Sequence, residues 1–241
     1  MNWPRFLVGP ELAEGVEYVL DPDTYRHVRA LRLRPGDRLV LTDGRGAQRL
    51  VALGDRSGST AKVQTVAEPL SDRESPLAIT LCLAPTKQER TEWAVEKATE
   101  LGVREIIFVR STRASLASNR LRLERLERVA VAALEQCQRR ILPRICGPVP
   151  IDEALERTAT VERRILLWEG SDPPPRPWRA DPRPRTAAAM IGPEGGWSAP
   201  EVALACSAGW EPTALGPRVL RAETAAITAA VRMQALWGDL G

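Results

Sequence analysis

The feature that most constrains this chain is a change of pattern at residue 77, after which apolar strands alternate with amphipathic helices. The segment 77–83 is almost entirely apolar, as strands buried on both faces are. Further strands are expected at 105–109, 164–168, 187–191 and 212–215, and helices at 86–101, 119–140 and 223–237. Thr86 and Glu89 fit a capping box at the start of the first helix. Because such alternation is typical of a parallel sheet with helices on both faces, we predict an α/β fold for residues 76–241.

The first 70 residues have a different pattern, in which short alternating runs are broken by turn residues. Residues 38–42 and 48–53 flank a glycine-containing turn, which predicts a hairpin, and another strand is expected at 61–67. We therefore predict a small β-rich barrel or sandwich over residues 1–70, followed by a polar linker at 71–76.

The composition argues against several classes of site. The 4 cysteines are scattered and His27 is the only histidine, so we expect no metal centre and no Ser-His-Asp or Cys-His hydrolase site. Unpaired cysteines fit a reducing compartment. No apolar run approaches the roughly 18–20 residues of a membrane span, and the N-terminus lacks a secretory signal pattern. We expect a cytoplasmic protein without a membrane partner.

The basic residues are unusual in kind and in distribution. Only Lys62, Lys87 and Lys97 are lysines, so 31 of the 34 Lys and Arg residues are arginines. A GC-rich genome would explain the excess, but residues 26–49 concentrate seven arginines against two aspartates, a net charge of +5. Such a strip indicates an anionic partner. The candidate RNA-binding residues are Arg26, His27, Arg29, Arg32 and Arg34. A lone histidine such as His27 is more often structural than RNA-stacking.

Three loops that directly follow predicted strands have an unusual composition, namely 168–170, 191–196 and 215–221. In open parallel sheets, ligands bind beyond the carboxyl ends of the strands, and glycines there let the backbone approach a ligand closely. The chain has neither G-x-G-x-x-G nor G-x-x-x-x-G-K-[ST], which disfavours a dinucleotide or a triphosphate. Loops without lysine favour a ligand recognised by its adenine edge and ribose. Each loop alone is also compatible with an ordinary strand-to-helix turn.

Together, residues 191–198 (IGPEGGWS) and 215–225 (LGPRVLRAETA) resemble the signature of RsmE-type methyltransferases of the SPOUT superfamily. Residues 27–37, 93–102 and 135–137 also resemble that family, so the resemblance covers almost the whole chain. It implies a PUA-like β-barrel followed by an α/β domain whose end forms a trefoil knot. It also implies S-adenosylmethionine bound in the knot loops, a homodimer, and methylation of N3 of a uridine in the decoding region of 16S rRNA in the small ribosomal subunit.

Two features depart from the family's pattern. The segment 172–184 is denser in proline than the resemblance leads us to expect, and its structure is not predicted. Trp197 stands where phenylalanine is more usual.

Carried over by motif, the family's cofactor site falls at the ends of the predicted strands. The residues are Leu167, Trp168, Glu169, Gly170, Ile191, Gly192, Pro193, Glu194, Gly195, Gly196, Leu215, Gly216, Arg218, Val219, Leu220, Thr224 and Ala225. Thr224 is equally compatible with a purely helix-terminal role.

The implied reaction also limits the choice of catalytic residues. Uridine N3 becomes nucleophilic only when its proton leaves, so the reaction needs a base or a cation that stabilises the imidate at O2 and O4. Arg218 and Arg221, in the third loop, suit the cationic role unless they are structural. Glu223 is a candidate base, but at a helix start it is equally a candidate cap or arginine partner.

Other interpretations stay open from the sequence. The chain could be a knotted methyltransferase that acts on another RNA or another atom, or a non-catalytic RNA-binding protein of ribosome assembly. Apolar residues of the final helix are expected to contribute to a two-fold interface. They are Ile227, Val231, Leu236 and Trp237.

Overall fold

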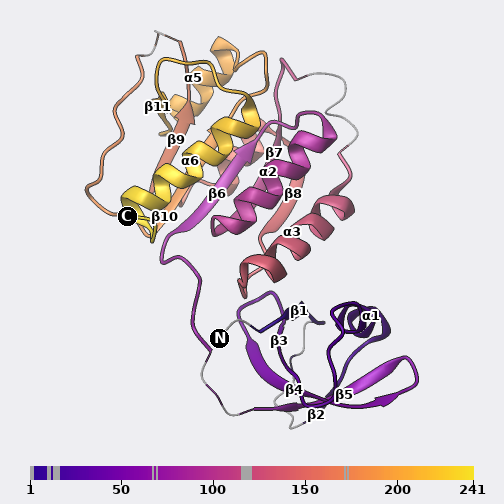
Figure 1. The fold of residues 1–241 in the computed structure, drawn as a ribbon. Coiled ribbons are helices and arrows are strands. Elements are labelled where there is room, and N and C mark those ends of the chain that lie inside the picture. Colours follow the sequence, from indigo (N-terminus) through magenta and orange to yellow (C-terminus); the bar gives the residue numbers. More distant parts are fainter. Residues whose placement is uncertain are drawn as a thin grey trace. The chain divides into compact units, whose positions relative to one another are not determined.

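The computed structural model describes residues 3–9, 12, 17–66, 68, 70–114, 121–170, 172 and 174–241. The chain divides into two compact units. One comprises residues 1–74 and 134–142, and the other comprises residues 75–133 and 143–241. Figure 1 shows a small curled β-sheet in the first unit and a larger sheet flanked by helices in the second.

The first unit is built on a five-stranded sheet in the order β1-β3-β4-β5-β2. The strands are β1 (Arg5–Leu7), β2 (Glu17–Val19), β3 (Arg38–Thr42), β4 (Gln48–Ser57) and β5 (Thr60–Thr65). β1 is parallel to β3, and the other neighbours are antiparallel. The predicted hairpin is confirmed as β3 and β4. Its turn is closed by Asp43, whose Oδ1 accepts hydrogen bonds from the N–H groups of residues 45–47.

Helix α1 (Pro22–Ala30), which was not predicted from the sequence, packs against the strands of the first unit. Asp21 is its N-cap and accepts hydrogen bonds from two backbone N–H groups of the first turn, where Pro22 has no N–H and so needs no acceptor. Tyr25 and Val28 are buried in the core of this unit. The basic side chains of α1 are therefore left on the solvent side.

The end of helix α3 (Leu123–Cys137) and the turn after it belong to the first unit. Glu135 Oε1 accepts a hydrogen bond from the backbone N–H of Leu7 at 3.0 Å. The N–H of Leu142 donates to the carbonyl of Gly44 at 2.8 Å. A segment more than ninety positions away in the sequence thus completes the small β-unit.

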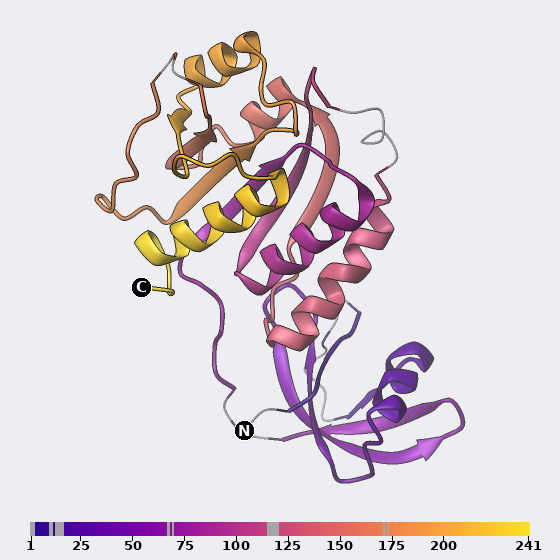
Figure 2. The ribbon, with the colours of Figure 1, turned by 45° about the horizontal axis from the view of Figure 1, so that its top comes forward.

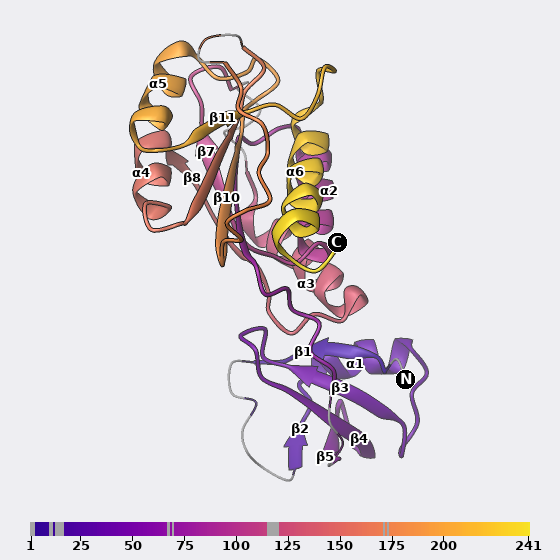
Figure 3. The ribbon, with the colours of Figure 1, turned by 90° about the vertical axis from the view of Figure 1, so that its left-hand side faces the viewer.

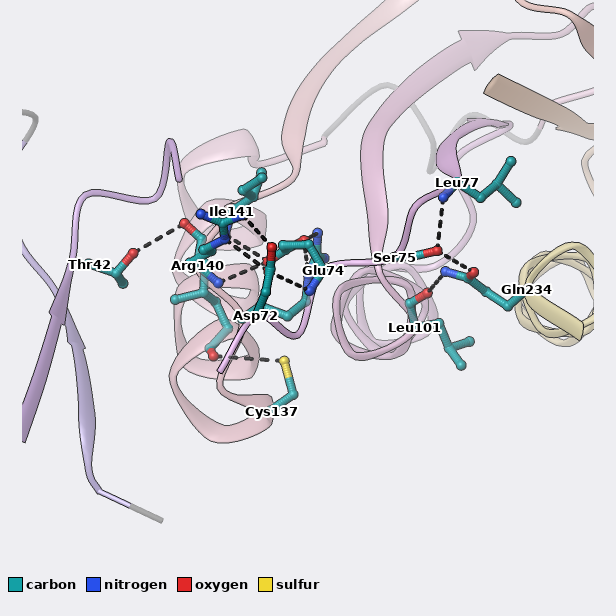
Figure 4. A network of polar contacts seen from close by, with 12 residues as sticks. Thr42, Asp72, Glu74, Ser75, Leu77, Leu101, Cys137, Arg140, Ile141 and Gln234 are labelled. Carbon is teal, nitrogen blue, oxygen red and sulfur yellow. Dashed lines mark hydrogen bonds and ion pairs between the residues drawn. The ribbon is translucent and has the colours of Figure 1, made fainter. Parts of the chain in front are cut away.

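The linker is tied to the same turn by ion pairs. Asp72 pairs with Arg140 at 2.6 Å, and Glu74 accepts hydrogen bonds from the N–H groups of Arg140 and Ile141 (Figure 4). Glu74 also pairs with Arg139 at 2.9 Å, and both of these side chains are buried. Asp72 and Glu74, which the sequence places in an unpatterned linker, therefore form specific contacts with the turn after α3.

The second unit contains a six-stranded sheet in the order β11-β9-β10-β6-β7-β8, in which every neighbouring pair is parallel. The strands are β6 (Ala78–Leu83), β7 (Val103–Arg110), β8 (Arg144–Pro150), β9 (Arg163–Leu167), β10 (Thr186–Ile191) and β11 (Glu211–Thr213). After Thr186, β10 carries only apolar side chains, all of them buried, as expected of a central strand.

Helices cover both faces of this sheet, as the α/β prediction requires. α2 (Gln88–Glu100) and α6 (Ala222–Trp237) lie side by side on one face, and α4 (Ile151–Arg157) and α5 (Ala199–Ser207) lie on the other (Figure 3). Within the described ranges, no helix is both long enough and apolar enough to cross a membrane.

Several boundaries differ from the predictions. The predicted capping box of α2 is wrong, because its N-cap is Lys87 and no side chain caps the helix. The Thr86 hydroxyl instead lies 3.3 Å from that of Thr91. Helix α3 is shorter than the predicted 119–140, and residues 119 and 120 lie outside the described residues. β8, α4 and α5 were not predicted.

The proline-rich connector between β9 and β10 runs along the outer side of the sheet toward the end of α6 (Figure 2). Arg176 bridges to Thr213 of β11, and Trp178 Nε1 donates to the carbonyl of Ala214 at 3.1 Å. Trp178 also packs against Trp237, whose ring centroid lies 6.0 Å away and whose Nε1 donates to the connector carbonyl of Arg179. The connector is thus attached to its own domain at several points.

Candidate functional site

The three predicted loops meet at the carboxyl ends of β9, β10 and β11, where they enclose a cavity of about 140 Å³. Its walls come from all three loops and from the first residues of α6. The lining residues are Leu167, Trp168, Glu169, Ile191, Gly192, Pro193, Glu194, Gly196, Trp197, Thr213, Ala214, Leu215, Gly216, Arg218, Val219, Leu220, Ala222 and Ala225. Backbone and apolar side chains dominate this wall, and it holds no lysine.

Two glycines of the cavity have backbone conformations that L-residues rarely adopt. Gly196 has φ of +67° and Gly216 has φ of +127°, and a Cβ built on either would meet no atom within 4 Å. Both backbones therefore border open space rather than packed neighbours. Gly192 differs, because its Cβ position lies 3.1 Å from the indole nitrogen of Trp197. Gly192 allows the tryptophan ring to pack against the loop, and the other two let a ligand approach the backbone.

Two tryptophans that line the cavity have buried indole nitrogens without a hydrogen-bond partner among the described residues. They are Trp168, which follows β9, and Trp197, which follows β10. A buried N–H without an acceptor is costly, which makes each a candidate donor to a ligand. The Trp168 ring also fills the space beside Gly170, where a Cβ would clash with it. Gly170 thereby accommodates the ring although it does not itself line the cavity.

Arg90, in the first turn of α2, connects two parts of the site. Its Nη1 lies 2.7 Å from Glu194 Oε1 in the loop after β10, and its Nε lies 3.6 Å from Glu223 Oε1 at the start of α6. Glu223 is 8% exposed, and its Oε2 has no hydrogen-bond partner in the described structure. Of the roles left open for Glu223, the structure shows the arginine partner, because its carboxylate faces Arg90.

The loop after β10 is also held from the side of β7. Glu201 accepts hydrogen bonds from the N–H of Thr112 at 2.8 Å and from the N–H of Ser198 at 2.7 Å, and so forms the capping box of α5. Although burial raises the pKa of Glu201, these hydrogen bonds outweigh burial and hold the pKa below its ordinary value. Arg113 Nη1 donates to the carbonyls of Gly195 and Trp197. The shape of the loop is therefore fixed by contacts outside the cavity.

The structure brings together most of the predicted cofactor residues. Three of them lie outside the cavity wall: Gly170, Gly195 and Thr224. Among the predicted catalytic residues Arg218 lines the cavity, whereas Arg221, the N-cap of α6, and Glu223 do not. Arg218 and Arg221 are both exposed and have no ion-pair partner among the described residues.

The predicted RNA-binding residues lie in the first unit and are all exposed: Arg26, His27, Arg29, Arg32 and Arg34. Arg26 forms an ion pair with Asp23 at 3.0 Å, in which both side chains are largely exposed. Arg32 has a φ of +58°, so the chain reverses there directly after α1. No cluster of side chains able to hold a metal ion occurs among the residues described.

Comparison with known proteins gives the site its family. The RNA methyltransferase domain matches residues 73–234, and the RNA methyltransferase PUA domain matches residues 20–64. The chain belongs to the RNA methyltransferase family.

Relatives in the RNA methyltransferase family match the chain over nearly its whole length. Ribosomal RNA small subunit methyltransferase E of Synechocystis sp. is 32% identical, and the match covers 96% of this chain and 77% of the Synechocystis protein. The protein of that name from Mycobacterium bovis is 30% identical, and the match covers 89% of this chain and 85% of the Mycobacterium protein. The crystal structure of ribosomal RNA small subunit methyltransferase E from Neisseria gonorrhoeae, bound to S-adenosyl methionine, has 31% identity and a TM-score of 0.90, with 100% of both chains covered.

These matches confirm the predicted fold class for this RNA methyltransferase: a SPOUT-type α/β domain with a PUA-like β-domain before it. The resemblance to the RsmE type is confirmed as well. Motif reading missed Arg90 and the cavity-lining residues Trp197, Thr213, Ala214 and Ala222. The last three immediately flank the third loop, so they were within reach of the sequence. Arg90 carried no local signal, because its partners are 104 and 133 positions away.

Proposed function

We propose that this chain transfers a methyl group from S-adenosylmethionine to N3 of a uridine in the decoding region of 16S rRNA in the small ribosomal subunit. The observation that carries the proposal is the cavity at the ends of β9, β10 and β11, built from glycine-bearing loops. A relative of matching fold and 31% identity is bound to S-adenosyl methionine. Relatives over nearly the whole chain are named for methylation of small-subunit rRNA.

The residues of the cavity fit S-adenosylmethionine as a ligand. Gly196 and Gly216 leave open space where a flat ring or a ribose could contact the backbone. The unpaired indole nitrogens of Trp168 and Trp197 are donors in need of an acceptor. Glu169 lines the cavity without an ion-pair partner in the described structure, and a free carboxylate suits ribose hydroxyls and a cationic ligand. When bound, this group would supply an electrophilic methyl group.

The predicted cofactor residues that line the cavity are proposed to contact S-adenosylmethionine. Gly170 is proposed to act through the ring of Trp168, and Gly195 through the carbonyl that Arg113 holds. Thr224 is assigned to the first turn of α6 rather than to the cofactor, because it lies outside the cavity wall.

We assign the chemical step on the protein side to arginines. Loss of the N3 proton leaves negative charge on uracil O2 and O4, and a nearby guanidinium stabilises that charge. Arg218 lines the cavity, and Arg221 lies three residues further at the start of α6; neither is occupied by an acidic partner among the described residues. Glu223 remains the candidate base, with Oε2 as its unpartnered acceptor, although Arg90 holds the other oxygen.

RNA positioning is proposed for the strip that includes Arg26, His27, Arg29, Arg32 and Arg34. All five side chains are exposed, and arginine side chains donate readily to phosphate oxygens. Because these residues lie on another unit of the chain, their contribution is expected in binding rather than in chemistry.

The proposed activity is tested by transfer of labelled methyl groups from S-adenosylmethionine to small ribosomal subunits and to naked 16S rRNA, followed by nucleoside analysis. Label in 3-methyluridine is the expected result. Label in another nucleoside would replace the proposal with a methyltransferase of different target. No label, with cofactor and RNA both bound, would indicate a non-catalytic RNA-binding protein.

We also propose a homodimer in the cytoplasm, where rRNA is modified. Val231 of α6 is 41% exposed and available for a two-fold contact, as the sequence predicts. Trp237 is not available, because its ring is buried against Trp178 of the same chain. Light scattering at micromolar concentration should give twice the chain mass of 26.5 kDa, and a monomer mass would contradict the proposal.

A further inference from the structure

A second cavity, of about 250 Å³, lies within the first unit and shares no lining residue with the first. It is formed by β1, β3, the linker and the turn after α3, and its wall contains two arginines and no acidic residue. The lining residues are Trp3, Arg5, Val40, Leu70, Ser71, Arg73 and Gln138. A cavity with two cations and no anion in its wall suits an anionic ligand.

Arg5 is the distinctive member of this wall. Its side chain belongs to a residue that is only 7% exposed, and its Nη1 donates to Gln48 Oε1 at 2.9 Å. Its Nε is buried and has no partner, and Nη2 donates no hydrogen bond to a described residue. Nε and Nη2 form one edge of the guanidinium, the edge that binds two oxygens of a phosphate or carboxylate side by side. Among the described residues, nothing occupies that edge.

No acidic side chain of the described residues forms an ion pair with Arg5. Burial is the main cause that lowers the pKa of Arg5, and the positive charges of Arg73 and Arg140 lower it further, although Cys137 and Glu74 act in the opposite direction. Arg73 is exposed and makes no ion pair with a described residue. A buried guanidinium without an anionic partner lowers the stability of the fold, and a bound anion would remove that loss of stability.

The nearby carboxylates do not supply that anion. Glu74 Oε2 accepts from Arg139, and Glu74 Oε1 accepts from two backbone N–H groups. Asp72 is paired through both oxygens with Arg140, as Figure 4 shows. The acidic residues of the linker are thus committed to the turn after α3, and the two cavity arginines stay free for an external ligand.

We propose that this cavity binds a phosphate group of the RNA backbone, with the free edge of Arg5 as the buried donor and Arg73 at its mouth. The choice of RNA as the source of the phosphate rests on the proposed function. The site lies outside the strip of residues 26–49 that the sequence singles out, apart from the apolar wall residue Val40. It therefore adds a second, more enclosed contact to the exposed arginines of the first unit.

The direct test follows the Nε–H signal of Arg5 by ¹⁵N nuclear magnetic resonance in the full-length protein. The signal is assigned by its loss in Arg5→Lys, with the circular dichroism spectrum confirming that this variant folds. A single-stranded oligoribonucleotide should shift the signal, and the shift should saturate together with RNA binding. A signal that responds to inorganic phosphate but not to the oligoribonucleotide would assign the cavity to free phosphate and overturn the proposal, as would no response to either probe.

A second measurement uses Arg73→Ala, which removes an exposed side chain and leaves the core intact. Its RNA affinity should fall about threefold to tenfold at low salt, and the slope of log affinity against log salt should decrease by ~0.7, the value for one phosphate contact on a single strand. Arg128→Ala, which removes an exposed arginine of α3 with no ion-pair partner among the described residues, is the matched control and should leave the slope unchanged. Equal slopes in the two variants would overturn the assignment of Arg73.

These outcomes are independent of the methylation assay. If the Arg5 signal responds to RNA while no methyl group is transferred, the cavity assignment stands and the proposed function fails. If methyl transfer proceeds while the Arg5 signal is unaffected by saturating RNA, the proposed function stands and the cavity assignment fails.

Discussion

Arg90 Nη1 donates to Glu194 Oε1 over 2.7 Å, and this contact joins the first turn of α2 to the loop that follows β10. Glu194 lines the proposed cofactor cavity, but Arg90 does not. The ion pair is partly exposed, so it adds little to global stability. The contribution of the ion pair is to hold the loop after β10 in place, because the backbone of that loop lines the proposed cofactor cavity.

We therefore expect Arg90→Ala to weaken binding of S-adenosylhomocysteine by about threefold to tenfold, equivalent to roughly 0.7–1.4 kcal/mol, with little change in melting temperature. Calorimetric titration checks the affinity. Arg125→Ala is the matched control. It breaks an ion pair between Arg125 of α3 and Glu92 of α2, and neither of these residues lines the cavity. Equal affinities in the wild type and Arg90→Ala would remove Arg90 from the site.

A substitution at Gly216 tests whether its open side belongs to the cofactor. Gly216→Val adds a side chain toward the cavity at a φ of +127°, so it combines a backbone cost of about 1–3 kcal/mol with steric exclusion of a ligand. Gly46 has almost the same φ, +125°, and equally open surroundings, but lies in the first unit. Gly46→Val should share the loss of stability, whereas only Gly216→Val should abolish binding of S-adenosylhomocysteine. Retained binding in folded Gly216→Val would place the ligand elsewhere.

The proposed division between RNA positioning and chemistry predicts opposite kinetic effects. Arg29→Ala and Arg32→Ala should weaken RNA binding but leave the single-turnover rate with saturating RNA unchanged, since those contacts are equal before and during the reaction. Arg221→Ala and Arg218→Ala should lower that rate, by ~10²-fold for the residue that stabilises the developing charge. If both variants keep the full rate, the catalytic assignment passes to Glu223.

The sequence predicted five of the six strands of the second unit, because these strands contain apolar runs, whereas β8 (RICGPVP) does not and was missed. β10 is the clearest case, because five consecutive apolar residues followed by a glycine-containing loop are typical of a buried strand that ends at the edge where ligands bind. The start of α2 was misplaced, because a threonine before a helix was assumed to bond the helix backbone. In the structure Thr86 meets Thr91 instead, and this pairing depends on the fold rather than on local spacing.

Long-range polar contacts account for most of what the sequence did not reveal. Nothing in the local pattern indicates that Arg90 will meet Glu223, or that Arg5 will be buried in a cavity wall without an acidic residue. The turn after α3 is another example, since Arg139 and Arg140 read as the polar end of a helix, yet they organise the linker. Apolar periodicity indicates which face is buried, but it does not identify partners across the fold.

Glu201 makes the loop after β10 sensitive to acid. The pKa of Glu201 is held below its ordinary value, so its contribution to stability is present above the unfolded-state pKa of about 4.3 and is lost as the pH falls through the folded-state pKa. At pH 7, Glu201→Gln should lower the free energy of unfolding by about 2 kcal/mol, as expected for hydrogen bonds to a charged group. The difference from wild type should shrink in urea titrations below pH 4. Glu153→Gln, which breaks a partly exposed pair on α4, is the control and should show neither effect. A deficit independent of pH would show that the charge of Glu201 contributes nothing.

The ion pair between Arg139 and Glu74 should be the costliest to break. Its side chains are 2% and 3% exposed, and loss of the cation would leave the Glu74 carboxylate buried. Arg139→Met should lower the free energy of unfolding by roughly 3–5 kcal/mol. Arg26→Met, which breaks a pair with Asp23 at 74% and 81% exposure, should cost less than about 1 kcal/mol. Equal denaturation midpoints for the two variants would contradict this ranking.

The proline-rich connector has two parts. The attached part should not accept inserted residues, and the unattached part should accept them. At residues 176–179, backbone and indole hydrogen bonds to β11 and α6 fix the number of residues, because one extra residue would move every later contact out of register. Residues 180–183 are exposed and carry none of these contacts. Inserted segments, such as an epitope or a protease site, should therefore be accepted there while the cavity keeps its shape.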